Sequence, residues 1–303
     1  MGKKSILFLF LMTGVVSGMA WFFWGGRAEE IVQPTVVSWD VENSSNRNLE
    51  IIENVRGLVA TASGEWAVYV YRIDGGEGYG VDWAKIMPGA SIMKLPALAA
   101  VKREIDGGQL TLDDVWTIEK ADHADGSGPL QFKAPGTKVT VKQVLTELGK
   151  KSDNTAWVMI NRRLGYPKIE KVVEDWGLIN SNYRELTTTA EDVTVMWREI
   201  YKDSSNWEYL EDSIYEDRIS LGVPVDRVRL VHKVGTDTDV WADSGIVMER
   251  VSSEIQASDS GAVKLFEPFI LVILNKGVER EEARRVVLEI TKTVWKSEAG
   301  QGR

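Results

Sequence analysis

Pro88-Gly89-Ala90-Ser91-Ile92-Met93-Lys94 is the stretch at which the pattern of the chain changes from strands to helices. Before it, residues 66–73 and 79–83 are typical of strands and are joined at Gly75-Gly76, which predicts a hairpin. After it, an apolar run to Val101 begins a long block with helical spacing. Because Pro88-Gly89 is a turn signal, we expect Ser91 at a helix start.

Working outward, a helical period at 49–58 precedes the hairpin. The central block contains helical patterns at 141–148, 155–164, 169–176 and 190–201. The chain then returns to strand patterns at 229–234, 242–249 and 269–274, and closes with a helical one at 279–295. This order predicts an α/β domain built from both chain ends, with a helical domain inserted between them. A small-molecule site is expected where the two meet.

The N-terminus predicts an exported protein. Lys3 and Lys4 precede an uncharged run from Ile6 to Trp24, which is long enough to cross a bilayer. Small residues near Gly18 leave a cleavable signal peptide open, but the aromatic residues at 21–24 favour an uncleaved signal anchor. Either way, we expect the remainder outside the cytoplasm, anchored to the membrane through this segment or secreted.

The domain boundaries follow from these patterns. The expected segments are a signal anchor or signal peptide at 1–24, a linker at 25–48, a catalytic domain at 49–295 and a tail at 296–303. Within the catalytic domain, 49–88 and 226–295 form the α/β part and 89–225 the helical part.

Composition excludes several classes of function. The net charge of −9 argues against a nucleic-acid-binding protein. With no cysteine and only His123 and His232, the chain lacks thiol chemistry and is a poor candidate for a metal centre, so we expect no cofactor and no metal. The chemistry must come from hydroxyls, amines, carboxylates and backbone groups. We also expect a monomer.

Ser91 and Lys94 are separated by three positions, which places both side chains on one face of a helix. A serine hydroxyl becomes a good nucleophile when a base lies within hydrogen-bonding reach. A lysine amine can be that base if burial or a nearby cation lowers its pKa. The alternative is a chance helix start with a solvated lysine. We expect Pro96 to interrupt the helix just after the motif, which a purely structural helix would rarely choose.

Two further motifs lie at element boundaries. Ser152-Asp153-Asn154 precedes a helical pattern, where its residues could simply cap the helix. Lys233-Val234-Gly235-Thr236 falls in a strand pattern, where a glycine would let a ligand approach the backbone. Its alternative is an ordinary edge strand with an exposed lysine. Each motif alone indicates little.

Together and in this order, the three motifs resemble the signature of penicillin-binding proteins and class A β-lactamases. Other segments that resemble this family are 126–130, 135–137, 187–190, 241–247 and 269–295. The resemblance covers about 49–295. It implies a β-lactamase/transpeptidase-like α/β fold: an antiparallel sheet flanked by terminal helices, with an inserted all-helical domain.

The resemblance also implies roles for individual residues. Ser91 would attack the substrate carbonyl, Lys94 would take its proton, and Ser152 would relay a proton to the leaving nitrogen. Lys233 would supply positive charge toward Ser152 and the substrate carboxylate. The remaining substrate-binding candidates are Asn154, Gly235, Thr236 and Arg218, with the backbone N–H groups of Ser91 and Thr236 forming the oxyanion hole. For Arg218, an ordinary surface position is the alternative.

The chain departs from the family at two places. The segment between Trp176 and Thr187 is too short for the loop that carries the family's deacylating glutamate, and Glu185 stands in the wrong place for it. Val234 stands where the family usually has a hydroxyl residue that contacts the substrate carboxylate. We therefore expect acylation with inefficient hydrolysis of the acyl-enzyme.

Three functions remain open. The first is a β-lactamase-like serine hydrolase acting on β-lactams or peptidoglycan-type peptides. The second is a D-alanyl-D-alanine carboxypeptidase, penicillin-binding protein or esterase. The third is a non-catalytic cell-wall binding module.

Overall fold

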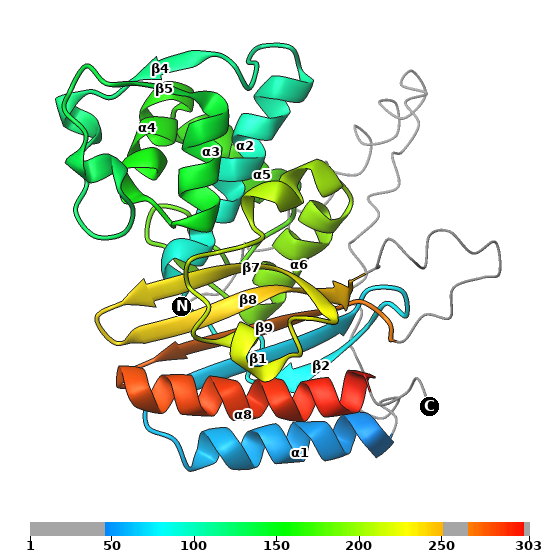
Figure 1. Ribbon diagram of the computed structural model, residues 1–303. Coiled ribbons are helices and arrows are strands. Elements are labelled where there is room, and N and C mark those ends of the chain that lie inside the picture. The colour runs from blue at the N-terminus through cyan, green and yellow to red at the C-terminus, as the bar shows by residue number, and fades with distance from the viewer. Residues whose placement is uncertain (1–45, 251–265, 300–303) are drawn as a thin grey trace, which may run out of the picture. The chain divides into compact units, whose positions relative to one another are not determined.

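The computed structural model describes residues 46–250 and 266–299. Its centre is a five-stranded antiparallel sheet in the order β2-β1-β9-β8-β7, which places β7 at one edge (Figure 1). The strands of this sheet are β1 (Glu65–Arg72), β2 (Glu77–Val81), β7 (Val228–Asp237), β8 (Val240–Glu249) and β9 (Phe269–Lys276). Because β1 and β2 come from one end of the chain and the others from the opposite end, both chain ends build the sheet.

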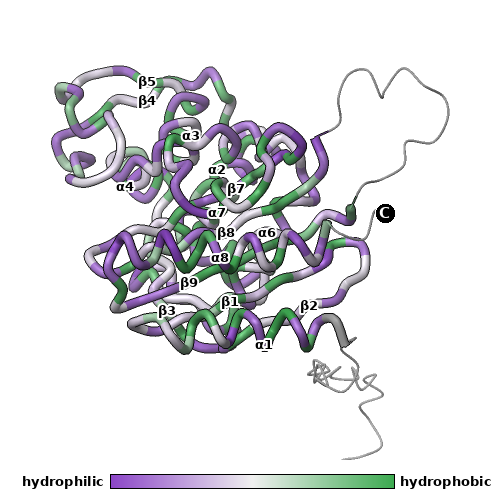
Figure 2. The backbone as a smooth tube through the Cα atoms, turned by 60° about the horizontal axis from the view of Figure 1, so that its bottom comes forward, coloured by the Kyte–Doolittle hydropathy of each residue, from purple (hydrophilic) through white to green (hydrophobic). Residues whose placement is uncertain are grey.

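Each face of the sheet packs against its own helices. The terminal helices α1 (Asn46–Ala60) and α8 (Arg280–Ala299) lie side by side on one face (Figure 1). In Figure 2 the α8 tube alternates between hydrophobic and hydrophilic residues, as expected for a helix with one buried side. On the opposite face, α6 (Ala190–Tyr201) packs against β1, β8 and β9. Side chains alternate along each strand, so β1, β7, β8 and β9 each contribute to two separate cores.

The helical part stands beyond α6 and packs around α2 (Figure 1). Its α-helices are α2 (Leu95–Asp106), α3 (Val141–Lys150), α4 (Asn154–Leu164) and α5 (Tyr166–Asp175). Its 3₁₀ helices are η2 (Ala90–Lys94), η3 (Lys120–Asp122), η4 (Leu130–Phe132) and η5 (Ser204–Tyr209). Two small sheets complete it, formed by β3 (Met87–Pro88) with β6 (Thr187–Thr188) and by β4 (Val115–Thr117) with β5 (Lys138–Thr140).

The predicted fold class is confirmed: an antiparallel sheet, terminal helices and an inserted helical region are all present. The prediction for Pro96 was wrong, because it occupies the first turn of α2 and does not interrupt a helix. In that turn its missing N–H has no helical partner to lose, so proline fits there without cost.

Long-range contacts extend both terminal helices beyond the predicted bounds. The α1 helix begins at Asn46, inside the predicted linker, and α8 continues to Ala299, inside the predicted tail. The reason is a buried cluster in which the Arg72 guanidinium donates to Asn48 Oδ1 at 2.8 Å and to both oxygens of Glu298 at 2.8 and 2.9 Å. A buried arginine requires such partners, and the two helix ends supply them.

The chain re-enters the α/β part earlier than the predicted position 226. The short helix α7 (Ile219–Gly222) packs against α8, and Ile219 and Val223 belong to the core beneath the sheet. The predicted anchor at 1–24 lies outside the described residues. Within 46–250 and 266–299, no helix is long and apolar enough to span a bilayer.

Candidate active site

Ser91 lies in η2, which leads directly into α2. The turn before it is held at Gly89, whose N–H donates to Leu186 O at 2.8 Å and whose carbonyl accepts from Ile92 N at 3.0 Å. Ser91 is half-buried, whereas Ile92 and the two residues after it are buried. The serine hydroxyl therefore remains reachable from solvent while Lys94, one turn later, does not.

Lys94 is 4% exposed and is held by the Ser152 turn. Its Nζ donates to the Ser152 carbonyl oxygen at 2.5 Å, to Asn154 Oδ1 at 2.7 Å and, more weakly, to Ser152 Oγ at 3.5 Å. Burial lowers the pKa of Lys94 to about 7, although the nearby Asp153 carboxylate opposes this shift. The solvated-lysine alternative is therefore wrong, and close to neutral pH a large fraction of this amine is uncharged.

Ser152 has a left-handed backbone with φ +52°, a conformation that costs a non-glycine residue free energy. The next residue stabilises the turn, because the Asp153 carboxylate accepts from Ala156 N and Leu130 N, both at 2.8 Å. Asp153 is thus the N-cap of α4, as the capping interpretation predicts. The same turn directs Ser152 Oγ toward Lys94 and Lys233, so the residues that cap α4 also position this hydroxyl.

Lys233 reaches the same hydroxyl from the sheet. It is 2% exposed on β7, and its Nζ donates to Ser152 Oγ at 2.7 Å and to Val234 O at 3.0 Å. Burial lowers the pKa of Lys233 well below its usual range, and the positive charges of Lys94 and Arg218 add to this effect. The exposed-lysine alternative is wrong here as well.

Gly235 is required by the packing of β7 against η2. A Cβ atom at this position would lie 2.5 Å from the carbonyl oxygen of Gly89, which is far inside van der Waals contact. The glycine therefore allows the edge strand to approach the turn that carries Ser91.

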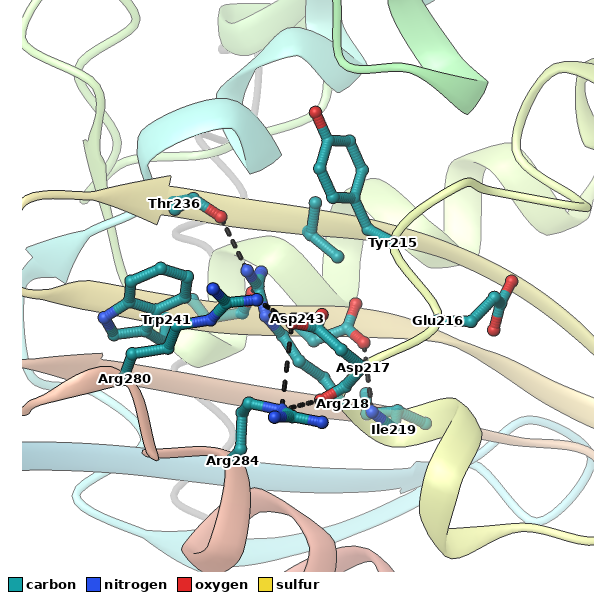
Figure 3. Close-up of polar contacts among 12 residues, drawn as sticks. Tyr215, Glu216, Asp217, Arg218, Ile219, Thr236, Trp241, Asp243, Arg280 and Arg284 are labelled. Carbon is teal, nitrogen blue, oxygen red and sulfur yellow. Dashed lines mark hydrogen bonds and ion pairs between the residues drawn. The ribbon is translucent and has the colours of Figure 1, made fainter. Parts of the chain in front are cut away.

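Arg218 is 1% exposed, so its interpretation as a surface arginine is wrong. Its guanidinium lies beneath β7 and β8, donating to Thr236 Oγ1 and to Ala242 O, both at 2.7 Å (Figure 3). The β7–β8 register is regular, so Val234 and the exposed Thr236 share one face of the strand without a bulge. The hydroxyl of Thr236, which is hydrogen-bonded to Arg218, therefore lies two residues after Val234, the position where the family usually has its hydroxyl residue.

The structure brings Lys94, Ser152, Asn154 and Lys233 together around one hydroxyl, with Ser91 on the turn that carries Lys94. In the described part of the chain, Ser91 Oγ makes no hydrogen bond. Contacts of this kind are often long in free enzymes and shorten with substrate. The arrangement offers a half-buried serine on the turn that carries a buried amine with a lowered pKa, and a second hydroxyl between two amines.

The segment between α5 and α6 supplies no carboxylate to this group. Glu185 is exposed, and its carboxylate makes no hydrogen bond or ion pair with the described residues. The segment is instead held by the buried Tyr183, whose hydroxyl accepts from Trp157 Nε1 at 2.6 Å and donates to Asn161 Oδ1 at 2.8 Å. Nor do the described residues contain a group of three or more acidic or histidine side chains that could hold a metal ion.

Comparison with known proteins agrees with this geometry. The sequence model of the β-lactamase enzyme family matches residues 50–297, most of the chain. The chain belongs to this family. It is accordingly a β-lactamase-like serine hydrolase. A search among curated proteins finds no match.

Solved structures share the fold of this β-lactamase family member. PBP-A matches with a TM-score of 0.70 and 20% identity, over 82% of this chain and 95% of that one. A β-lactamase from Sphaerobacter thermophilus DSM 20745 has the same TM-score and identity, over 82% and 96%. A PBP-A variant determined as an acyl-enzyme complex with penicillin G also matches with a TM-score of 0.70 and 20% identity, over 83% and 96%.

Sequence reasoning missed the partners of His232. Strand alternation turns this residue away from Lys233, and it is buried. Its Nδ1 lies 3.1 Å from the fully buried Asp243 carboxylate, and its Nε2 lies 3.6 Å from Glu216. An aspartate inside the apolar strand 240–249 is itself a signal, because a buried carboxylate needs a partner.

Proposed function

We propose that the chain forms an acyl-enzyme through Ser91 with β-lactams or with peptidoglycan-type peptides. The observation that carries this proposal is the pair of amines that contact Ser152 Oγ, Lys233 Nζ at 2.7 Å and Lys94 Nζ at 3.5 Å. Both lysines are buried. Two amines converging on one hydroxyl have little value for stability, because each raises the cost of charging the other.

In the first step, Ser91 Oγ attacks the substrate carbonyl while its proton passes to neutral Lys94. A pKa of about 7 makes this amine suitable as a general base at neutral pH. The backbone N–H groups of Ser91 and Thr236 are the proposed oxyanion donors, and each such donor typically contributes about 3–4 kcal/mol to transition-state stabilisation.

In the second step, the carbonyl–nitrogen bond breaks and the leaving nitrogen takes the Ser152 hydroxyl proton. Ser152 recovers a proton from the Lys94 ammonium, so no net proton is gained or lost. Lys233 stabilises the developing charge on Ser152 Oγ. Asn154 Nδ2 donates to Asp125 O at 2.7 Å, which leaves its second N–H for a substrate amide.

Carboxylate recognition would fall to Thr236 and Arg218 and not to position 234. A matched substrate pair tests this assignment: a penicillin and its methyl ester. Arg218→Lys, which keeps the charge but not the planar fork, should weaken acylation by the free acid about tenfold and leave the ester nearly unchanged. Equal weakening for both substrates would remove Arg218 from substrate recognition.

We further propose that the acyl-enzyme is long-lived, as in a penicillin-binding protein. This proposal is supported by the position of Glu185, which is exposed and makes no hydrogen bond or ion pair with the described residues through its carboxylate. No described carboxylate is bonded to Lys94, Ser152 Oγ or Lys233 to activate a deacylating water. Acyl transfer from D-alanyl-D-alanine peptides or esters is the companion activity that such an enzyme would have. We also propose that the catalytic part acts outside the cytoplasm, on the basis of residues 1–24.

The decisive experiment is a time course of adduct formation with labelled penicillin, followed by mass spectrometry. An adduct on Ser91 supports the enzyme, and Ser205→Ala, an exposed serine, is the control for Ser91→Ala. A persistent adduct means penicillin-binding behaviour, whereas rapid loss with nitrocefin turnover means an efficient β-lactamase. An absence of any adduct would leave only a non-catalytic binding module.

A further inference from the structure

Residues 212–218, which we call the 212–218 strap, join the helical part to the α/β part beside Ser152. The strap is bonded to the end of α3 at two neighbouring carbonyl groups. The Lys150 carbonyl accepts from Ile214 N at 3.1 Å and from Ser213 Oγ at 3.3 Å. The Lys151 carbonyl accepts from the Tyr215 hydroxyl at 3.4 Å. These carbonyls belong to the backbone immediately before the left-handed residue Ser152.

The other end of the strap is bonded to the sheet. Arg218, its last residue, donates to Thr236 Oγ1 and to Ala242 O, and the next residue, Ile219, donates through its N–H to Asp243 Oδ2 at 3.2 Å. Figure 3 shows the Tyr215 side chain extending past β7, with its hydroxyl at the end away from Arg218 and Arg284. One short segment therefore holds both the Ser152 turn and the proposed carboxylate site.

The orientation of Ser152 matters because its hydroxyl must serve two lysines. A left-handed backbone persists only when its surroundings hold it. On one side it is held by Lys94, which donates to the Ser152 carbonyl, and on the other by the strap through the Lys151 carbonyl. Small displacements of a proton-transfer group cost rate, because the reacting atoms must lie within hydrogen-bonding distance.

We propose that Tyr215 is a positioning residue for the proton transfer from Ser152 to the leaving group. The inference rests on the proposed acyl-enzyme function and deepens it. The Tyr215 hydroxyl fixes the Lys151 carbonyl, which fixes the peptide that leads into Ser152 and hence the direction of Ser152 Oγ. Tyr215 itself neither gives nor takes the transferred proton.

This role has a chemical signature, because leaving groups differ in their need for a proton. A β-lactam nitrogen must be protonated as its bond to the carbonyl breaks. The sulfur of a thioester leaves as a thiolate, which is stable near neutral pH and needs no proton at that step. A defect confined to Ser152 positioning should therefore slow β-lactam acylation and spare thioester acylation. A general structural defect would slow both.

The test compares benzylpenicillin with phenylacetylglycyl-thiolactate, a linear thioester with the same acyl side chain. Acylation of Ser91 is followed by rapid quench and mass spectrometry in the full chain. Tyr215→Phe should slow acylation by benzylpenicillin about fivefold, the usual value of one hydrogen bond, with the thioester rate unchanged. Ser213→Ala should act in the same direction. The control is Tyr201→Phe, because the Tyr201 hydroxyl has no hydrogen-bond partner among residues 46–250 and 266–299 and its ring stacks on Trp207.

The outcomes separate this inference from the function on which it rests. Equal slowing of both substrates by Tyr215→Phe, or no slowing of either, overturns the positioning role while acylation by wild type stands. Ser152→Ala is the reference, since it should show the same selectivity with a larger loss. If wild type fails to acylate with benzylpenicillin, or Ser152→Ala slows both substrates alike, the proposed mechanism fails and the inference fails with it.

Discussion

The two faces of β7 shift the pKa values of two adjacent buried basic residues in opposite directions. Lys233 and His232 are 2% and 1% exposed, respectively, and point to opposite sides of the strand. Burial lowers the pKa of Lys233 well below its usual range. Burial alone would also lower the pKa of His232, but the Asp243 carboxylate raises it to about 9. The face of β7 toward the helical part (the helical-domain face) thus disfavours the charged form of its amine, whereas the face toward α8 (the α8 face) favours the charged form of its imidazole.

The difference lies in the oxygen atoms that each face provides. Lys233 meets a hydroxyl and a backbone carbonyl, which accept hydrogen bonds but carry no charge to offset burial. His232 meets Asp243 and Glu216. A strand can therefore carry an amine with a lowered pKa on one face and a structural ion pair on the other, at adjacent positions. Adding a carboxylate beside the amines on the helical-domain face should raise their pKa values, and removing one from the α8 face should lower the pKa of His232.

The largest effect is expected from removing the proposed base, Lys94, which η2 places against β7. Lys94→Met keeps the length of the side chain but has no amine to accept the Ser91 proton, so the acylation rate should fall by about a thousandfold. The rate is measured as formation of the Ser91 adduct with penicillin. Lys202→Met, on a 66% exposed side chain, is the matched control and should acylate normally. Normal acylation by Lys94→Met would assign the base elsewhere.

The next largest effect is expected from removing the carboxylate on the α8 face. In the folded protein the pKa of His232 is about 9, above the ordinary value of 6.5. The stability gained from its charge is therefore complete below pH 6.5 and is lost as the pH rises through 9. This difference corresponds to roughly 3 kcal/mol of unfolding free energy.

Asp243→Asn should strongly reduce that pH dependence and lower stability at pH 6, with Glu216 as the remaining carboxylate partner. The measurement is denaturant unfolding of both proteins at pH 6 and pH 9, where the difference between them isolates the pair from other titrating groups. Asp237→Asn, at an exposed position of the same hairpin, is the control. Parallel stability curves for wild type and Asp243→Asn would contradict the ion pair.

A smaller effect is expected from placing a carboxylate on the helical-domain face. Asn154 Oδ1 accepts from Lys94 Nζ at 2.7 Å, so Asn154→Asp sets a negative charge against the amine with little change of shape. The pKa of Lys94 should rise from about 7, and the rising limb of the acylation rate against pH should move upward with it. A shift of about one unit lowers the rate at pH 6 about tenfold. Coincident pH profiles would show that Lys94 is not the group being titrated.

Much of this comparison could be predicted from the sequence, because its elements are set locally. Strand alternation placed His232 opposite Lys233, and the three motifs indicated that Ser91, Lys94, Ser152 and Lys233 belong to one site. The antiparallel sheet and its helices followed from hydrophobic periods and turn residues. The alternation, the hydrophobic periods and the turns depend on residues a few positions apart, whereas the grouping of the three motifs into one site came from their resemblance to the family.

Features that depend on distant contacts could not be predicted. Nothing local to Arg218 distinguishes a surface arginine from one buried beneath β7, because its partners lie 17 to 24 positions further along the chain. The ends of α1 and α8 are likewise fixed by Arg72 on β1. The sequence resemblance paired Lys94 with Ser91, whereas the structure bonds it to the Ser152 turn.

The smallest effect is expected where the sequence offers a carboxylate but the structure leaves it unused. Glu185 is exposed, and its carboxylate makes no hydrogen bond or ion pair with the described residues. Glu185→Gln should therefore change the rates of formation and loss of the Ser91 adduct by no more than about twofold, as is usual for a surface substitution. The measurement is the decay of the penicillin adduct after excess ligand is removed. Slower decay in Glu185→Gln would mean that this side chain turns inward to activate water. The Glu185 carboxylate would then lie near the helical-domain face of β7 during turnover. The absence of a carboxylate there, which distinguishes this face from the α8 face, would hold only for the free enzyme.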